Sequence, residues 1–433
     1  MMTEALLKNR GIRRRDFARF LAGAGGAALI EASGLPRPRP APLPETPEFP
    51  NEAFWSNVRK QFLMPPELAV MNAANLCPSS APVLEALYAA TRDVDQDPSF
   101  NNREKMTEGK ERTRKLLAAF LGVTPEEIVI TRNTSESNNL VSSGIELKPQ
   151  DEVIIFSDNH PSNHLAWTEK ARRFGFTVRV VDQVNPHPGD EYYIDAFTKQ
   201  MNARTKVLAF THLTSTAGDL LPARELCRIA RERGILSMVD GAQSFGLMNV
   251  DLSDMQPDFY SGSAHKWPCG PKETGMLFIN KRAHSTIWPS IYSAYPGATG
   301  ISKSFERFGQ RDEPAIIAFG EALQFQTKIG RKLIEERART LAQMLMTELK
   351  KVDGVKLWTH PDSGRSAAVV TFFPANLDPK KLSAVLYEKD RIAGATREGA
   401  DRPGLRFSPH IYNSPPEVER IVAAIKRYVA TGV

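Results

Sequence analysis

The chain has 433 residues, 41% of them hydrophobic, so it can bury a large core and is expected to fold into two or three globular domains. Its formal net charge is +6, but residues 1–40 contain eight Lys and Arg against three Asp and Glu, which is +5 of that charge. The rest of the chain has almost no net charge, so its charge gives no indication of nucleic-acid binding. Three widely spaced cysteines, Cys77, Cys227 and Cys269, indicate neither a disulfide framework nor a zinc site, and no apolar run predicts membrane insertion.

The first 34 residues resemble a twin-arginine export signal peptide. Arg14 and Arg15 would be the arginine pair, Phe17 and Arg19 follow, and a weakly apolar stretch rich in Gly and Ala comes next. A disordered basic tail is the alternative. The signal predicts recognition by the twin-arginine translocase and a periplasmic or other extracytoplasmic location, reached by a protein that is already folded.

Two segments are expected before the main domains. The proline-rich residues 35–50 predict a stiff linker with no core of its own. Residues 51–75 contain an amphipathic stretch with Phe54, Trp55 and Val58, which indicates an N-terminal arm that lies against the body.

Residues 76–312 are predicted to form a large α/β domain. Apolar residues recur at helical spacing over 82–94 and 108–121, and Gly122 is placed as a C-cap. Short apolar strands alternating with helices then indicate a mostly parallel sheet covered on both faces, with ligands bound beyond the carboxyl ends of the strands. The strands are predicted at 128–131, 153–157, 178–181, 207–211 and 235–239, and the helices from 135, through 167–174 and over 223–233.

Residues 313–433 are predicted to form a smaller α+β domain packed on the first. Two long helical stretches lead into alternating strands and helices. The helices are expected at 313–328, 332–350, 379–388 and 417–430, and the strands at 355–358, 367–373 and 405–408.

An acid and a lysine in the large domain suggest the central chemistry. Asp240 ends an apolar strand, and Lys266 follows His265 in a turn between two strand-like runs. A lysine amine can form a Schiff base with the aldehyde of pyridoxal 5'-phosphate, and a carboxylate can keep the pyridine nitrogen protonated, so that the ring accepts electrons from the substrate Cα. Alone, these residues are equally compatible with ordinary turn chemistry.

Other polar residues recur where strands end and helices begin. Thr134 and Ser135 would present hydroxyl groups and amides to a phosphate at a helix N-terminus, with Ser135 as a simple N-cap the alternative. His160 is expected to lie over the face of a planar cofactor, unless it is a surface helix cap. The remaining candidates are Ser215 and Thr216 near the cofactor phenolic oxygen or the substrate, Gln243 at the phenolic oxygen, Ser263 and His265 at the phosphate, and, more weakly, Asn163 and His164.

Arg406 is the predicted anchor for a substrate carboxylate. It ends a predicted strand near the C-terminus, and its planar guanidinium matches a carboxylate in two-point geometry. A structural surface arginine is the alternative.

Over about residues 70–430 the ordered motifs resemble the class V aminotransferase family of pyridoxal phosphate enzymes, and most of all its isopenicillin N epimerase-like branch. The resemblance implies fold type I and a homodimer whose active sites lie at the subunit boundary. It also implies that Lys266 is the Schiff-base lysine. Gln310 would lie in the segment that reaches the neighbouring subunit's phosphate site, at a position where the family usually has threonine. The motifs are N-T-S-E (133–136), H-P-S-N (160–163), H-L-T-S-T-A-G (212–218), D-G-A-Q (240–243), A-H-K-W (264–267), F-G-Q-R-D-E-P-A (308–315) and L-R-F-S-P-H-I-Y-N (405–413).

The resemblance leaves the reaction open. Cysteine desulfurases carry a catalytic cysteine in their C-terminal part, and this chain has no cysteine after Cys269, which disfavours desulfuration. Epimerisation, amino transfer, C–S lysis and kynureninase-like hydrolysis remain. The chain also resembles periplasmic enzymes that tailor a peptide-bound glutamate in siderophores such as pyoverdine. A different class, an exported protein of this fold that binds without turnover, is the non-enzyme alternative.

Overall fold

A computed structural model describes residues 42–374, 376–398 and 401–433. The predicted export signal and the first part of the predicted linker lie outside these residues. Within the described ranges, every helix is too short or too polar to cross a lipid bilayer.

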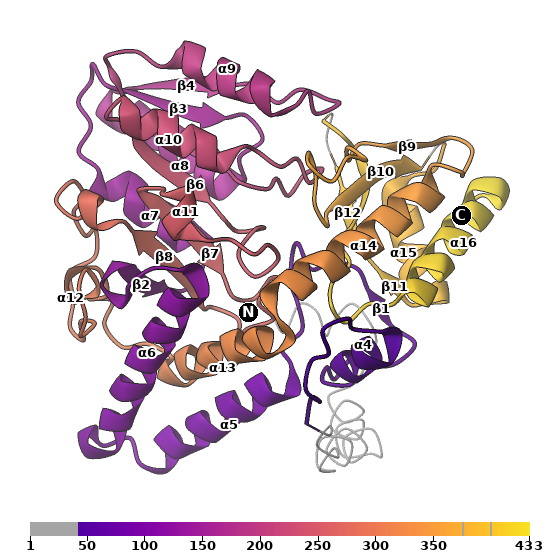
Figure 1. Cartoon of the computed structure of the whole chain (residues 1–433), viewed down its shortest axis with the longest axis horizontal. Coiled ribbons are helices and arrows are strands. Elements are labelled where there is room, and N and C mark those ends of the chain that lie inside the picture. Colours follow the sequence, from indigo (N-terminus) through magenta and orange to yellow (C-terminus); the bar gives the residue numbers. More distant parts are fainter. Residues whose placement is uncertain (1–41, 375, 399–400) are drawn as a thin grey trace, which may run out of the picture. The chain divides into compact units, whose positions relative to one another are not determined.

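A central sheet of seven strands organises the large domain, in the order β2-β8-β7-β6-β5-β3-β4 (Figure 1). Strands β3 to β7 pair in parallel with their neighbours, and β8 runs antiparallel to both β2 and β7. The predicted α/β class and mostly parallel sheet are therefore confirmed. The strands are β2 (Ile128–Thr131), β3 (Glu152–Phe156), β4 (Thr177–Val181), β5 (Thr205–Thr211), β6 (Leu236–Asp240), β7 (Phe259–Ser263) and β8 (Gly275–Ile279).

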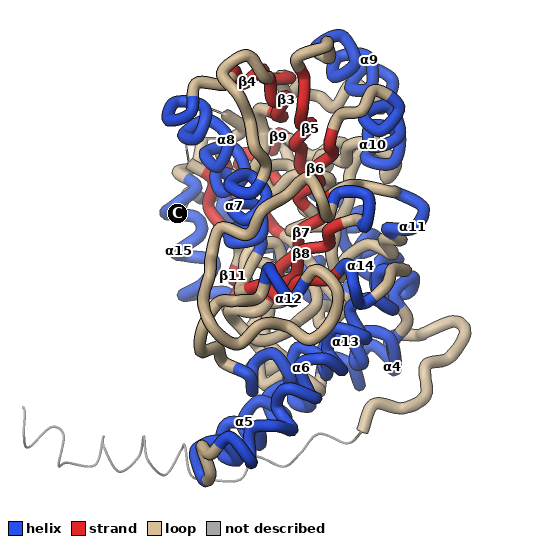
Figure 2. Tube along the Cα trace, turned by 90° about the vertical axis from the view of Figure 1, so that its left-hand side faces the viewer, coloured by secondary structure: helices blue, strands red, loops and turns tan. Residues whose placement is uncertain are grey.

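Helices cover both faces of this sheet, which is why its inner strands consist of continuous apolar residues. Figure 2 shows α7 and α8 on one side of the strands and α9, α10 and α11 on the other. The sequence analysis missed α9. The helices of this part are α5 (Ala81–Gln96), α6 (Phe100–Leu121), α7 (Thr134–Gly144), α8 (Pro161–Phe174), α9 (Asp190–Gln200), α10 (Ala223–Glu232), α11 (Leu252–Met255) and α12 (Ser302–Phe305), with short 3-10 turns at Pro125–Glu127 and Lys281–Ala283.

Helix α6 shows how local sequence sets these boundaries. The Ser99 side chain accepts a hydrogen bond from the Asn102 amide at the start of the helix. At its end Gly122 adopts a left-handed conformation with φ of 72°, as predicted, because glycine pays no Cβ penalty there.

The C-terminal part has its own antiparallel sheet in the order β12-β13-β10-β9. Helix α13 (Glu313–Ile329) packs against α5 and α6, whereas α14 (Arg331–Leu349) packs against α16, β9 and β10 (Figure 1). The other elements are β9 (Val355–Leu357), β10 (Val370–Pro374), α15 (Pro379–Asp390), β11 (Ile392–Ala393), β12 (Ala395–Arg397), β13 (Gly404–Phe407) and α16 (Pro415–Thr431).

The N-terminal arm completes this C-terminal part. Helix α4 (Glu52–Arg59) buries Phe54, Trp55 and Val58 in the same apolar core as β13, and β1 (Ala69–Val70) pairs in parallel with β11. The end of the predicted spacer also packs on the body, because Leu43 is buried and its carbonyl accepts a 2.7 Å hydrogen bond from Lys328 Nζ. This packing carries residues 72–77 towards the ends of the large-sheet strands.

Candidate functional site

A cavity of about 330 Å³ lies at the carboxyl ends of the parallel strands. It collects every predicted site residue except Gln310, Thr216 and the weaker candidates Asn163 and His164. The lining residues are Ala74, Asn75, Asn133, Thr134, Ser135, His160, Ser162, Ser215, Asp240, Ala242, Gln243, Ser263, His265, Lys266 and Arg406.

Asp240 is the last residue of β6 and is buried, and hydrogen bonds fix the orientation of its carboxylate. Its Oδ1 accepts a hydrogen bond of 3.0 Å from the Ala242 amide, and its Oδ2 accepts one of 2.9 Å from Asn138 Nδ2. Ser261 Oγ in turn donates to Asn138 Oδ1 over 2.8 Å. The sequence analysis missed Asn138, although it follows Thr134 by four residues and so shares its face of α7.

The glycine after Asp240 is required by packing. A Cβ on Gly241 would lie 2.1 Å from Cζ of the buried Tyr260 ring, far inside contact distance. The backbone at Gly241 therefore passes too close to the aromatic ring for any side chain. A larger residue at 241 would displace the strand end that carries the carboxylate.

Lys266 lies in the loop between β7 and β8 and is partly exposed to the cavity. Within the described residues its Nζ has neither a hydrogen bond nor an ion pair. Desolvation lowers the pKa of Lys266 to about 8; Asp240 opposes this effect and Arg406 adds to it. The amine therefore has a far larger neutral fraction near pH 7 than an ordinary lysine, although its protonated form still predominates. Burial likewise lowers the pKa of His265 to about 4, which leaves its imidazole uncharged.

The N-terminus of α7 forms the other end of the cavity. Asn133, not Ser135, is the N-cap, and its side chain accepts from the Glu136 amide. Ser263 Oγ lies 2.8 Å from both the amide nitrogen and Oγ1 of Thr134. The Ser135 amide has no partner among the described residues, so this end presents free donors and the positive end of a helix dipole to an anion.

His160 and Gln243 are each partly occupied by local contacts. His160 is the N-cap of α8, and its Nδ1 accepts from the Ser162 amide over 3.2 Å, which leaves Nε2 free. Burial, followed by the charge of Lys266, lowers the pKa of His160. Gln243 Nε2 donates to the Ala74 carbonyl and its Oε1 accepts from Trp267 Nε1, so one amide hydrogen of Gln243 remains available.

Arg406 is buried beside the cavity without a carboxylate partner among the described residues. Its Nη1 donates to the Ser215 carbonyl over 2.8 Å and its Nη2 to Asn72 Oδ1 over 3.2 Å. Nε is buried and unpartnered. Burial lowers the pKa of Arg406 to about 10, and the nearby Arg397 adds to that shift. A buried cation with an unused donor is suited to binding an anionic substrate group.

Several candidates lie outside the cavity. Gln310 is exposed and does not line it. Thr216 Oγ1 donates to Asp158 over 2.6 Å, and Asn163 Oδ1 accepts from Trp167 Nε1. His164 is half-buried and also lies outside the lining. Conversely, the sequence analysis did not single out five lining residues, Ala74, Asn75, Asn133, Ser162 and Ala242.

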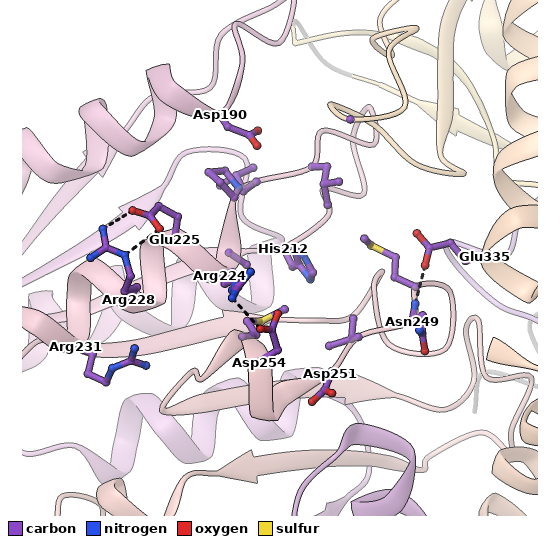
Figure 3. A pocket seen from close by; sticks show the side chains of 18 residues that line it. Asp190, His212, Arg224, Glu225, Arg228, Arg231, Asn249, Asp251, Asp254 and Glu335 are labelled. Carbon is purple, nitrogen blue, oxygen red and sulfur yellow. Dashed lines mark hydrogen bonds and ion pairs between the residues drawn. The ribbon is translucent and has the colours of Figure 1, made fainter. Parts of the chain in front are cut away.

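A larger cavity of about 740 Å³ lies elsewhere, beside the N-terminus of α10 (Figure 3). Its lining includes no lysine. Two of its arginines form ion pairs with neighbouring acids, Arg224 with Asp254 at 3.0 Å and Arg228 with Glu225. Its charged groups thus largely neutralise one another, and size alone does not identify the reaction site.

The residues of the smaller cavity fit pyridoxal 5'-phosphate. They provide an unpartnered amine, an oriented carboxylate, free donors at a helix N-terminus and a buried arginine around one space. The fold and this site define a pyridoxal phosphate enzyme of fold type I.

Comparison with known proteins identifies the family. Residues 81–421 match the aminotransferase class V model. The chain is 31% identical to isopenicillin N epimerase of Amycolatopsis lactamdurans over 390 residues, covering 86% of this chain and 98% of the relative. It is 24% identical to a probable cysteine desulfurase of Methanothermobacter thermautotrophicus, covering 87% and 98%. A solved C-DES mutant with glycine covalently linked to its PLP cofactor superposes with a TM-score of 0.78 at 23% identity, covering 85% and 98%.

The chain belongs to the aminotransferase class V family, as the sequence motifs predicted. It is a pyridoxal phosphate-dependent enzyme of that family.

Proposed function

We propose that Lys266 binds pyridoxal 5'-phosphate covalently through Nζ and that the enzyme acts at Cα of an amino acid or an amino-acid-containing peptide. The observation that carries this proposal is the meeting of an unpartnered Lys266 amine and the oriented Asp240 carboxylate in one cavity. The cofactor, when bound, supplies an electron-accepting ring that stabilises negative charge at the substrate Cα.

The other residues have distinct roles in this proposal. Asp240 holds a proton on the cofactor ring nitrogen through a charge-assisted hydrogen bond. Thr134, Ser135, Ser263 and His265 surround the phosphate end, where hydroxyl groups and amides donate. Five further residues complete the proposal: His160 at the ring face, Ser215 and Gln243 near the phenolic oxygen, Gln310 in the partner's phosphate site, and Arg406 at the substrate.

Lys266 also handles protons. Because burial lowers the pKa of its amine to about 8, Nζ can accept and return a proton near neutral pH. An ordinary lysine with a pKa near 10.4 would be protonated too strongly to act as a base under these conditions.

Arg406 selects for a substrate carboxylate. Its Nη1 and Nη2 contacts to Ser215 and Asn72 fix the guanidinium, and Nε stays available to an acceptor in its buried surroundings. A carboxylate here would neutralise a buried cation that lacks an acidic partner among the described residues.

The arrangement disfavours chemistry that requires a cysteine nucleophile. All three cysteines of the chain are buried and none lines the cavity. Epimerisation, amino transfer, C–S lysis and kynureninase-like hydrolysis need no such thiol and remain open. The identity to a protein named isopenicillin N epimerase supports an epimerase-like reaction first.

The decisive experiment is to incubate the purified holoenzyme with candidate amino acids and extracytoplasmic peptides, including siderophore precursors, and to identify products by mass and chirality. Inverted chirality at unchanged mass would indicate epimerisation, and a changed mass would indicate transfer or lysis. A holoenzyme whose absorbance and products stay unchanged with every substrate would instead support the non-catalytic binding protein.

We also propose a homodimer with shared active sites. Exposed aromatic side chains cluster on one loop, at Trp288, Tyr292 and Tyr295, and Gln310 is exposed. Large apolar side chains that are exposed together commonly mark an interface. Light scattering of the holoenzyme should give twice the chain mass, whereas a monomer with full activity would exclude shared sites.

The export proposal rests on the resemblance of residues 1–34 to a twin-arginine signal, which would place the enzyme in the periplasm. Changing Arg14 and Arg15 to lysine should leave unprocessed protein in the cytoplasm. Undiminished translocation of this variant would contradict the twin-arginine route and weaken the siderophore-tailoring alternative.

A further inference from the structure

Three chain segments that carry site residues meet a second time in a buried cluster outside the Lys266 cavity. The cluster contains Cys77, Cys269 and His410. The two sulfur atoms and a ring nitrogen of His410 all lie within 4.8 Å of one another. All three side chains are almost completely buried, and none lines the cavity.

The imidazole of His410 is oriented like that of a metal ligand. Its Nε2 lies 2.7 Å from the Trp267 carbonyl oxygen. Because a carbonyl only accepts, Nε2 carries the hydrogen and Nδ1 carries the lone pair. That Nδ1 is buried and has no hydrogen-bond partner in the part of the chain that the structure describes. A histidine that donates its second ring N–H to a backbone carbonyl is the usual arrangement around a bound metal.

The two thiols add soft sulfur donors to the imidazole. Cys77 Sγ lies 3.4 Å from the Tyr412 hydroxyl, which can donate to a thiolate, and Cys269 Sγ lies 3.6 Å from the Trp267 carbonyl oxygen. Thiolates with an imidazole favour zinc among the common divalent ions. In tetrahedral zinc geometry the sulfur atoms would be about 3.8 Å apart, so the cluster needs only a small contraction.

We propose that Cys77, Cys269 and His410 supply three of the four ligands of a buried tetrahedral zinc site, with a water molecule in the fourth position. Binding replaces the two thiol protons, which leave to solvent, so two thiolates balance the charge of Zn²⁺. Cys269 follows Lys266 by three residues, His410 follows Arg406 by four, and Cys77 follows Asn75 by two. The ion therefore fastens together the arm, the lysine loop and the segment after β13. The site is independent of which reaction the enzyme catalyses.

Metal content of the purified holoenzyme tests the site. After exposure to Zn²⁺ and desalting, wild-type protein should retain about one zinc per chain by mass spectrometry. Cys269→Ser and His410→Gln should each lower zinc retention at least about tenfold. Cys227→Ser is the matched control, since Cys227 is also buried but lies outside the cluster, and its zinc content should equal that of the wild type.

Cobalt substitution gives a test that needs no variant to fold. Co²⁺ added to metal-free wild-type holoenzyme should produce thiolate-to-cobalt absorbance that Zn²⁺ then displaces. Three outcomes would overturn the proposal: wild-type protein that binds neither metal, zinc content unaffected by Cys269→Ser and His410→Gln in folded protein, or a Cys77–Cys269 disulfide found by thiol alkylation without reductant.

Discussion

Asn138 donates a hydrogen bond from Nδ2 to Asp240 Oδ2 over 2.9 Å, and its own Oδ1 accepts from Ser261 Oγ. The carboxylate of Asp240 thus accepts hydrogen bonds from two donors, the Ala242 amide and Asn138. This support fixes the orientation of the acid that faces the cavity.

Replacing Asp240 by Asn should preserve the fold but lower activity. An amide cannot stabilise a proton on the cofactor ring nitrogen as a carboxylate does. Loss of one charge-assisted hydrogen bond costs about 1.5–3 kcal/mol, so kcat/KM should fall roughly 10- to 150-fold. Asp254→Asn removes an exposed acid of the larger cavity and should leave kcat/KM unchanged. Full activity of Asp240→Asn would contradict the assigned role of Asp240.

Cofactor loading should depend on pH through Lys266. Only the neutral amine attacks an aldehyde, and burial lowers the pKa of Lys266 to about 8. The rate of loading onto apoprotein should therefore rise about tenfold per unit below pH 8 and level off above it. Mixing apoprotein with pyridoxal phosphate from pH 6 to 10 and following the absorbance measures this profile. A rate that still climbs steeply from pH 9 to 10 would indicate an ordinary lysine.

The stability of the apoprotein should change with pH in the same direction. The folded pKa of Lys266 lies below its unfolded value, so the unfolded chain binds more protons between about pH 8 and pH 10.4. The contribution of this group to the free energy of unfolding therefore rises with pH across that window. Urea unfolding of wild type and Lys266→Met should differ in slope there, and parallel curves would argue against the lowered pKa.

Arg406→Lys should weaken substrate binding. The single ammonium nitrogen of a lysine cannot occupy the separate positions from which Nη1 and Nη2 reach Ser215 and Asn72 while Nε faces a carboxylate. KM should rise about 10- to 100-fold, the scale of a lost hydrogen bond between charged groups. Arg224→Lys, a change of the same kind in the larger cavity, should leave KM unaltered. An unchanged KM in Arg406→Lys would place the substrate carboxylate elsewhere.

Glu306→Gln should destabilise the large domain. Glu306 and Arg114 form a buried ion pair at 2.5 Å, and Glu306 Oε1 also accepts from the Ile130 amide of β2. The substitution leaves the buried Arg114 guanidinium with Glu111 as its remaining acidic partner, at 2.9 Å. The loss should therefore be about 2–3 kcal/mol, below the roughly 3–5 kcal/mol of a buried charge left without any partner. Urea unfolding followed by circular dichroism measures the loss. Glu232→Gln breaks an exposed pair with Arg228 and should cost less than about 1 kcal/mol; equal effects would contradict the importance of burial.

Local patterns predicted the strands of the large sheet well. Strand β2 has the predicted bounds, and β6 differs by one residue at each end, because continuous apolar runs between helices are unambiguous. Short strands were missed. β1, β11 and β12 contain two or three residues each, and their pairing is set by distant partners such as Ala69 with Ile392.

The residues of the site also differ in whether local sequence or long-range packing determines their position. Asp240 and Lys266 follow strands, so sheet topology alone predicts that they meet at one edge. The contributions of Ala74 and Asn75 depend on how the arm packs, which no local spacing reveals. The sequence analysis also did not predict the cluster of Cys77, Cys269 and His410, because residues so far apart in the sequence lack the short spacings typical of zinc motifs.

The central claim is that Lys266 is the residue that carries the cofactor. Borohydride reduction of the holoenzyme fixes the cofactor on the amine that holds it, and peptide mass mapping then identifies that amine. The account predicts the added mass on the peptide containing Lys266, in wild type and in the exposed control variant Lys272→Ala. Cofactor mass on any other lysine, or on none, would contradict it.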